Sequence, residues 1–111
     1  MSSLKKFEEA TFEAEVLQSE DPVLVDFYAD WCGPCHAMAP VVEQLSSDYS
    51  GRVTVGKLDV DSAPDIAMRY GVMGIPTLGL FKGGRMVDRL VGYPGPAGVK
   101  GWLERNLPAA A

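Results

Sequence analysis

The 111-residue sequence is poor in cysteine and histidine, with only Cys32, Cys35 and His36. A small secreted domain held together by disulfides would carry more cysteines, spread further along the chain. The two cysteines lie three positions apart. The pair is therefore either a site of local chemistry or a coincidence of composition.

Long apolar runs and an excess of basic charge are also missing. No apolar run approaches the roughly 20 residues that span a bilayer, and the start, MSSLKKFEEA, lacks the apolar segment of a secretory signal. The chain has 10 Lys and Arg against 15 Asp and Glu, a net charge of −5, which disfavours binding to nucleic acid. We expect a cytoplasmic protein without nucleic-acid or membrane partners.

The remaining composition is that of an ordinary globular domain. Hydrophobic residues make up 47% and charged residues 23% of the chain, which argues against disorder. The length fits one domain with its own core. We expect a single domain over residues 1–111, with flexible ends at 1–3 and 108–111.

The pattern of apolar residues predicts an α/β fold, with a mixed central sheet covered by helices on both faces. A βαβ unit with parallel strands is expected first, and a hairpin across Gly83-Gly84 and a final helix after it. Pro40 should kink the longest helix, and Ser62 to Asp65 resembles a helix-capping box. The expected strands are 4–7, 22–29, 53–58, 77–81 and 86–91, and the expected helices are 12–17, 32–49, 62–70 and 99–107.

The cysteine pair falls where the most apolar strand, 22–29, meets the start of the longest helix. Three-residue spacing at a helix start brings both sulfur atoms to one face, close enough for a disulfide. Gly33 adds no bulk, and Pro34 suits the first helical turn. The positive end of the helix dipole favours a thiolate at Cys32, while Cys35 lies one turn deeper. This pattern indicates a thiol that attacks disulfides and a second thiol that resolves the intermediate.

Three other interpretations of the pair remain open. A zinc site would need further ligands, and His36 is the only histidine. An inert buried pair is possible, although a helix start behind a tryptophan is an unusual place for one. Cys32 to His36 also matches the haem-attachment pattern C-x-x-C-H. His36 would then be one axial ligand, and the other could come from one of four methionines: Met38, Met68, Met73 or Met86.

At Trp31-Cys32-Gly33-Pro34-Cys35 the sequence resembles single-domain members of the thioredoxin family letter for letter. Further matching segments follow in order over residues 4–107. They are VLVDFYADWCGPC, the Ala-Pro pair at 39–40, Lys57 in VGKLDVD, Gly74 to Thr77, Phe81 to Gly84, and Val91-Gly92. The resemblance implies the thioredoxin fold.

The resemblance implies that Cys32 is the nucleophile and Cys35 the resolving thiol, and that Asp26 accepts a proton from Cys35. The residues support the last role independently, because Asp26 is the only charge in an apolar strand. Burial there should raise its pKa toward neutral pH. The alternative for Asp26 is a structural ion pair with Lys57, and both roles could hold together.

Pro76 matches the family's cis-proline, which faces the disulfide. The resemblance implies that its loop pairs with an extended substrate peptide. The implied docking surface consists of Trp31, Gly33, Met73, Gly74, Ile75, Gly92 and Tyr93, with Pro34, Lys57 and Pro76 as supporting residues. For Met73 and Tyr93 the alternative is an isolated exposed apolar side chain.

Three positions depart from the family's usual pattern. Tyr28 stands where many relatives have a second tryptophan, His36 where lysine or arginine is common, and Met73 where a polar or basic residue is common. His36 could make activity vary between about pH 6 and 7, or it could be a solvated helix residue. These departures affect fine tuning and partner preference.

The predicted function is reduction of protein disulfides by the Cys32–Cys35 dithiol, without a bound metal or organic cofactor. The resemblance implies disulfide-containing target proteins, re-reduction by a thioredoxin reductase, and a monomer. The alternative is a non-catalytic binding subunit that uses the same surface.

Overall fold

The computed structural model describes residues 4–108 and places the apolar run at 22–29 in the centre of a five-stranded sheet. The strand order is β1-β3-β2-β4-β5. Strands β1 and β2 both pair with β3 in parallel, and β4 is antiparallel to β2 and β5. In chain order the elements are β1 (Lys5–Phe7), η1 (Glu13–Leu17), β2 (Val23–Tyr28), α1 (Gly33–Asp48), β3 (Thr54–Asp59), α2 (Pro64–Arg69), β4 (Thr77–Lys82), β5 (Arg85–Val91) and α3 (Pro96–Asn106).

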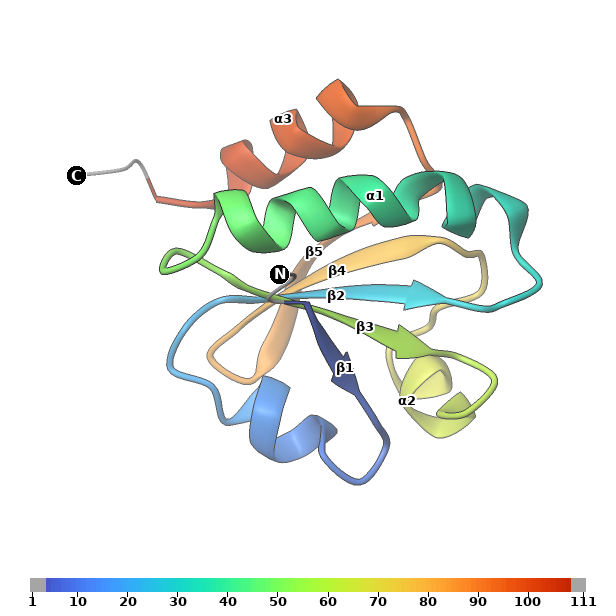
Figure 1. Cartoon of the computed structure of the whole chain (residues 1–111). Coiled ribbons are helices and arrows are strands. Elements are labelled where there is room, and N and C mark those ends of the chain that lie inside the picture. Colours follow the sequence, from blue (N-terminus) through green and yellow to red (C-terminus); the bar gives the residue numbers. More distant parts are fainter. Residues whose placement is uncertain (1–3, 109–111) are drawn as a thin grey trace.

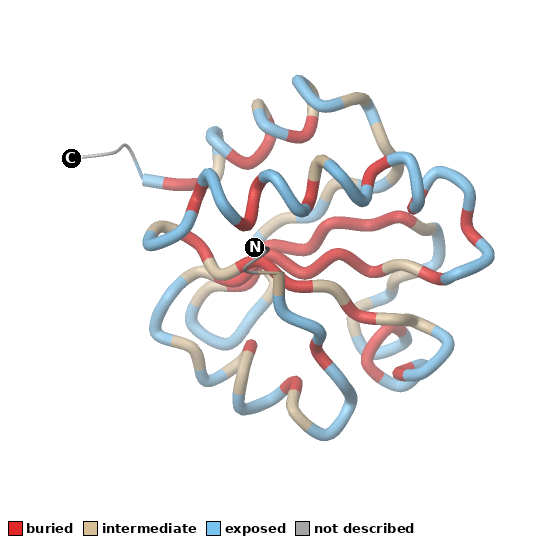
Figure 2. The backbone as a smooth tube through the Cα atoms, viewed as in Figure 1, coloured by how far each residue is buried: buried red, intermediate tan, exposed pale blue. Residues whose placement is uncertain are grey.

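Helices cover both faces of the sheet, as the sequence predicted. Figure 1 shows α1 and α3 over one face, with η1 and α2 on the other. Each face has its own apolar cluster. The first joins side chains such as Leu24, Met38 and Leu103, and the second includes Phe7, Phe27 and Phe81. Figure 2 shows the buried positions concentrated along the central strands.

Strand β2 has both of its edges paired and is buried almost along its whole length. Its apolar, β-branched sequence suits a strand that is covered on both faces. The strand leads directly to the cysteine pair, because α1 begins at Gly33. The central strand therefore fixes where the pair lies.

Helix α1 begins after Cys32, with Pro34 in its first turn, where a missing N–H costs little. Pro40 lies inside α1, which runs as one helix from Gly33 to Asp48. The kink at Pro40 stays a prediction. Gly51 follows with φ 88°, a backbone conformation that favours glycine and stops the chain from continuing as helix.

The hairpin between β4 and β5 is confirmed. Its two-residue turn, Gly83-Gly84, has φ of 59° and 85°, as the turn type that best joins two twisted strands requires. The capping box at Ser62 is wrong. Ala63 is the residue before α2 and makes no side-chain cap, while the Ser62 hydroxyl donates to Asp59 Oδ2 at 3.3 Å. Residues 13–17 do form a helical turn, and it is of the π type.

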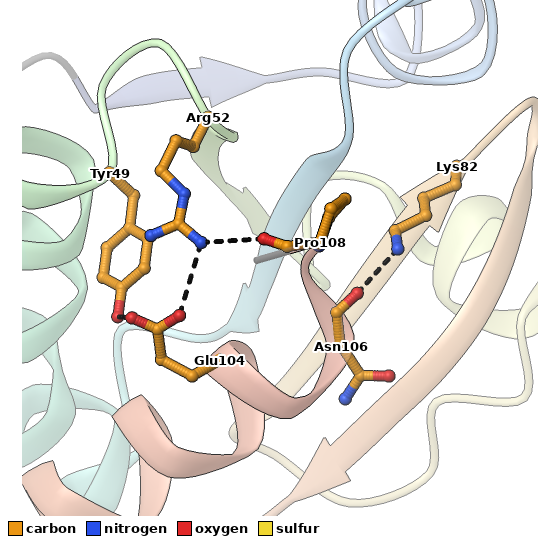
Figure 3. A network of polar contacts seen from close by, with 6 residues as sticks. All are labelled: Tyr49, Arg52, Lys82, Glu104, Asn106 and Pro108. Atoms are coloured by element: carbon orange, nitrogen blue, oxygen red, sulfur yellow. Dashed lines mark hydrogen bonds and ion pairs between the residues drawn. The ribbon is translucent and has the colours of Figure 1, made fainter. Parts of the chain in front are cut away.

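A polar network fastens the end of α3 to the rest of the domain (Figure 3). Tyr49 Oη donates to Glu104 Oε2 at 2.9 Å, and Arg52 Nη2 donates to the Pro108 carbonyl at 3.1 Å. Lys82 Nζ donates to the Asn106 carbonyl at 2.6 Å. Of the ends that were expected to be flexible, residues 1–3 and 109–111 lie outside the described residues.

No helix in the described part of the chain is both long enough and apolar enough to cross a membrane.

Candidate active site

Cys32 and Cys35 form a disulfide at the start of α1. Their Cα atoms are 5.2 Å apart, within the range that a disulfide spans. Cys32 is the residue before the helix, and its Sγ accepts a hydrogen bond from the Cys35 N–H at 3.2 Å. After reduction, this donor and the positive end of the helix would both favour a thiolate at Cys32.

The disulfide lies against a small apolar cluster. Both cysteines are 4% exposed, and they cluster with Ala29, while Ile75 packs against them. The Ile75–Pro76 peptide bond is cis, as the resemblance predicted. The Gly92 N–H donates to the Pro76 carbonyl at 2.8 Å, which ties the segment after β5 to this loop. The cysteines and the Pro76 loop are therefore neighbours, although they lie far apart in the sequence.

Asp26 is a buried carboxyl group with an unusual lack of partners. It lies on β2, is 4% exposed, and its Oδ1 makes no hydrogen bond. Burial raises the pKa of Asp26 to about 7, and the charge of Lys57 opposes this only in part. The two residues are neighbours in the register of β2 and β3. Across residues 4–108 the single salt bridge joins Arg52 to Glu104, so Asp26 and Lys57 form no direct ion pair.

A cleft of about 140 Å³ connects Asp26 with Cys35, and Lys57 and His36 lie in its wall. The cleft is large enough for water and has the polar walls that water needs. Lys57 extends over the Tyr28 ring, with Nζ 5.4 Å from the ring centre. The cleft therefore joins the buried carboxyl group of Asp26 to Cys35 through polar walls.

Residues around the disulfide form a partly apolar surface. Trp31 is 71% exposed and Met73 is 97% exposed. Gly74 is exposed as well, and Gly92 is half-buried. Tyr93 is not an isolated exposed side chain, because it is half-buried against the cluster under α1 and α3.

The sequence comparisons assign this fold and site to a family. Residues 3–105 match the family model described as Thioredoxin. The chain is 48% identical to the thioredoxin of Synechocystis sp., over 96% of this chain and the whole of that relative. The chain belongs to the thioredoxin family. It is also 51% identical to the thioredoxin of Chlorobaculum thiosulfatiphilum, over 78% of this chain and 83% of that relative. The bifunctional thioredoxin reductase/thioredoxin of Mycobacterium leprae is 50% identical, over 90% of this chain and 22% of that relative.

As a member of this family, the chain is a thiol-disulfide oxidoreductase that reduces protein disulfides. Its redox centre is the bonded pair Cys32 and Cys35. Thioredoxins need no bound cofactor for this exchange. Within the described residues no three His, Cys, Asp or Glu side chains are grouped so that they could hold a metal ion.

Membership in the family decides against the haem interpretation, and the structure accounts for the residues that suggested it. His36 Nε2 lies 2.6 Å from the Asp30 carbonyl oxygen and not at an open ligand position. Met38 is fully buried in the core, while Met68 and Met73 are exposed. These side chains have roles in packing or at the surface.

Two features of the site were missed from the sequence. Trp31 Nε1 donates to Asp61 Oδ2 at 2.8 Å, so Asp61 ties the residue that precedes Cys32 to the loop after β3. Val91, 61% exposed, lies beside Gly74 and extends the apolar surface. Because β2 and β3 are parallel, their carboxyl ends meet at one edge of the sheet. Asp61 follows β3 as Trp31 follows β2, and that signal could have identified Asp61.

Proposed function

We propose that Cys32 is the attacking thiol and Cys35 the resolving thiol. Cys32 thiolate attacks one sulfur of a target disulfide, forms a mixed disulfide and releases the other target sulfur as a thiolate. Cys35 thiolate then attacks Cys32 Sγ, which closes the Cys32–Cys35 disulfide and releases the second target thiolate. The target gains two electrons and the dithiol loses two. The order of roles is supported by the position of Cys32 at the positive end of α1, with an N–H donor on its sulfur.

We propose that Asp26 accepts the proton of Cys35 through water in the cleft. The observation that carries this role is a buried carboxyl oxygen without a hydrogen-bond partner, in a cleft whose wall includes Cys35. A pKa of about 7 suits proton exchange near neutral pH. Lys57 lies in the same cleft and would stabilise the carboxylate once the proton has been passed on.

The docking of targets is proposed to use the surface around the disulfide. Its members are Trp31, Gly33, Met73, Gly74, Ile75, Gly92 and Tyr93, and Val91 extends it. Pro34 and Pro76 would hold the two loops in place. The surface has apolar side chains for contact, and Gly74 on it is exposed and carries no side chain, so an extended peptide could approach the backbone there.

The proposed electron donor is a thioredoxin reductase. The relative from Mycobacterium leprae, named bifunctional thioredoxin reductase/thioredoxin, combines both in one chain, which supports such a partner here. We further propose a cytoplasmic location, because a dithiol that must return to its reduced form suits a reducing compartment. The proposed oligomeric state is a monomer. The second candidate function is a non-catalytic binding subunit, favoured by the exposed Trp31 and Met73.

The deciding experiment is reduction of insulin, driven by dithiothreitol and, separately, by NADPH with a thioredoxin reductase. We expect turnover in both formats, loss of turnover in Cys32→Ser, and a trapped mixed disulfide through Cys32 in Cys35→Ser. The absence of both turnover and trapped adduct would contradict the catalytic proposal. A Cys35→Ser variant that still fulfils the biological role would favour the binding subunit.

The role of Asp26 is tested with Asp26→Asn under single turnover. We expect release of the target thiol from the mixed disulfide to slow by about 10- to 100-fold near neutral pH. This slowing is no larger than the smallest effects typical of general acid–base catalysis. Attack by Cys32 should change far less. If both steps slow equally, Asp26 acts through the structure of the site and not as the proton acceptor of Cys35.

A further inference from the structure

A second cleft, shallow and wide open to solvent with a volume of about 510 Å³, lies between the end of α2 and strand β5. Three arginines line it, Arg69, Arg85 and Arg89, and the whole sequence has only five. None of the residues assigned to the cysteine site lines this cleft. We call it the arginine cleft.

The arginine cleft retains its positive charge. The one salt bridge found in the described chain is elsewhere, so no ion pair neutralises these three side chains. The guanidinium of Arg89 donates to the Tyr70 and Gly71 carbonyls at 2.5 and 3.1 Å, which holds it at the end of α2. Asp88 also lines the cleft as a negative charge, and its Oδ2 accepts hydrogen bonds from Trp102 and Asn106 of α3. Three arginines against one aspartate leave the lining with a net positive charge. The chain as a whole has a net charge of −5, so this site is a local positive patch on an acidic protein. Such a patch attracts anionic ligands.

Two chain segments join the arginine cleft to the proposed docking surface. From Arg69 the chain reaches Met73 in four residues. Along β5, Arg89 is two positions from Val91, which lies beside Gly74. Two residues of strand span about 7 Å. The arginine cleft is therefore within reach of a target held at Met73 and Gly74.

We propose that the arginine cleft binds an acidic segment of the target protein, next to the disulfide that is reduced. The proposal rests on the proposed docking of targets and adds a substrate class to it. Carboxylates suit arginine, whose fork of N–H donors can bind both oxygens at once. Exposed charges beside an interface mainly change the rate of association and its dependence on salt. The cleft selects targets and takes no part in the exchange of disulfides.

The test compares two disulfide peptides that differ only in a run of four Asp or four Asn, placed about four to eight residues from the cysteine. At low salt, about 0.02 M, we expect the acidic peptide to be reduced with about fivefold higher kcat/KM, the size of effect that two exposed charge pairs give. At about 0.5 M salt the preference should disappear.

Matched variants assign the preference to the cleft. Arg69→Gln/Arg85→Gln removes two charges from it and leaves Arg89, which holds backbone carbonyls. Lys5→Gln/Lys6→Gln removes two charges from exposed positions on β1, at the opposite edge of the sheet. We expect the first variant to lose the preference and the second to keep it. Both should reduce the neutral peptide at the rate of the unaltered protein.

Equal kcat/KM for the two peptides at low salt would overturn the proposal. An equal loss of preference in both double variants would also overturn it, because the preference would then come from the net charge of the protein and not from the cleft. Self-association that disappears in Arg69→Gln/Arg85→Gln would make a second copy of the chain the occupant, and would also overturn it. If the neutral peptide is reduced without any preference, the cleft proposal alone fails. If neither peptide is reduced, the proposed function fails with it.

Discussion

Two aspartates of the same sheet lie in opposite environments. Asp26, on β2, is buried with one carboxyl oxygen unpartnered, and burial raises its pKa to about 7. Asp88, on β5, accepts hydrogen bonds from the Arg89 N–H, the Trp102 indole and the Asn106 amide. These bonds, the one from Arg89 first, hold the pKa of Asp88 below its usual value.

The difference separates a carboxylate that stabilises the fold from one that does not. Asp88 is ionised and joins β5 to α3. Its hydrogen-bond donors stabilise the charge, and the charge strengthens those hydrogen bonds. Asp26 loses hydration and gains little in return. A buried carboxyl group with a perturbed pKa beside a reactive cysteine is typical of a functional residue. The contrast can be tested on stability, apart from any assay of activity.

The largest effect is expected for Asp26→Asn in the oxidised protein. Because the folded pKa of about 7 exceeds the ordinary 3.8, folding takes up a proton between these values, and wild-type stability falls as pH rises from about 4 to 7. The introduced asparagine does not titrate, so the stability of the variant should not fall in this way as pH rises. It should be more stable than the wild type by up to about 4 kcal/mol near pH 8, and nearly equal to it below about pH 4. Urea unfolding across this pH range measures the difference, and a difference that is independent of pH would contradict the account.

Asp88→Asn should change stability in the opposite direction, and by less than Asp26→Asn does. The variant loses an ionised acceptor, and we expect it to be less stable by about 1–2 kcal/mol at pH 7. Because the folded pKa of Asp88 is lowered, the wild-type advantage is present above the usual pKa of an aspartate and disappears as pH falls through the folded value. Asp21→Asn, at an exposed position, is the control and should leave stability unchanged. If Asp88→Asn and Asp21→Asn change stability equally, Asp88 does not have the stabilising role assigned to it.

The smallest effect is expected for Asp61→Ala, which removes a single exposed acceptor. Its bond to the Trp31 indole should contribute less than about 1 kcal/mol to stability. The side chain of Trp31 should become more mobile, which fluorescence anisotropy measures. In a Trp31→Phe background the remaining tryptophan, Trp102, is buried and should not respond. A response there would show that Asp61 acts on the whole fold.

Elements with a local signal could be predicted from the sequence. The apolar run of β2, the helical spacing of α1 and the Gly83-Gly84 turn each carry their information within a few residues. Ser62 shows where local patterns fail, because its hydroxyl donates to Asp59 and not to the start of α2. A short polar side chain can bind several nearby groups, and the fold decides between them.

The candidate site was predictable to a similar degree. Cys32, Cys35 and Asp26 stand out because their residue types are unusual at their positions. The bond between Trp31 and Asp61 joins residues 30 positions apart, and no local pattern records it. The same holds for the gathering of Arg69 with Arg85 and Arg89, which depends on how α2 packs beside β5. Contacts of this kind depend on how distant elements pack, and for Asp61 the parallel pairing of β2 and β3 gives only a partial signal in advance.

The place of β2 between β3 and β4 has a consequence for amide hydrogen exchange. A strand that is paired on both edges and buried on both faces opens only when the whole molecule unfolds, whereas edge strands such as β1 and β5 open in smaller fluctuations. The amides around Asp26 should therefore be among the slowest to exchange. Local opening cannot expose this carboxyl group to solvent, so its protons must come and go through the cleft beside Cys35 while the native state stays closed.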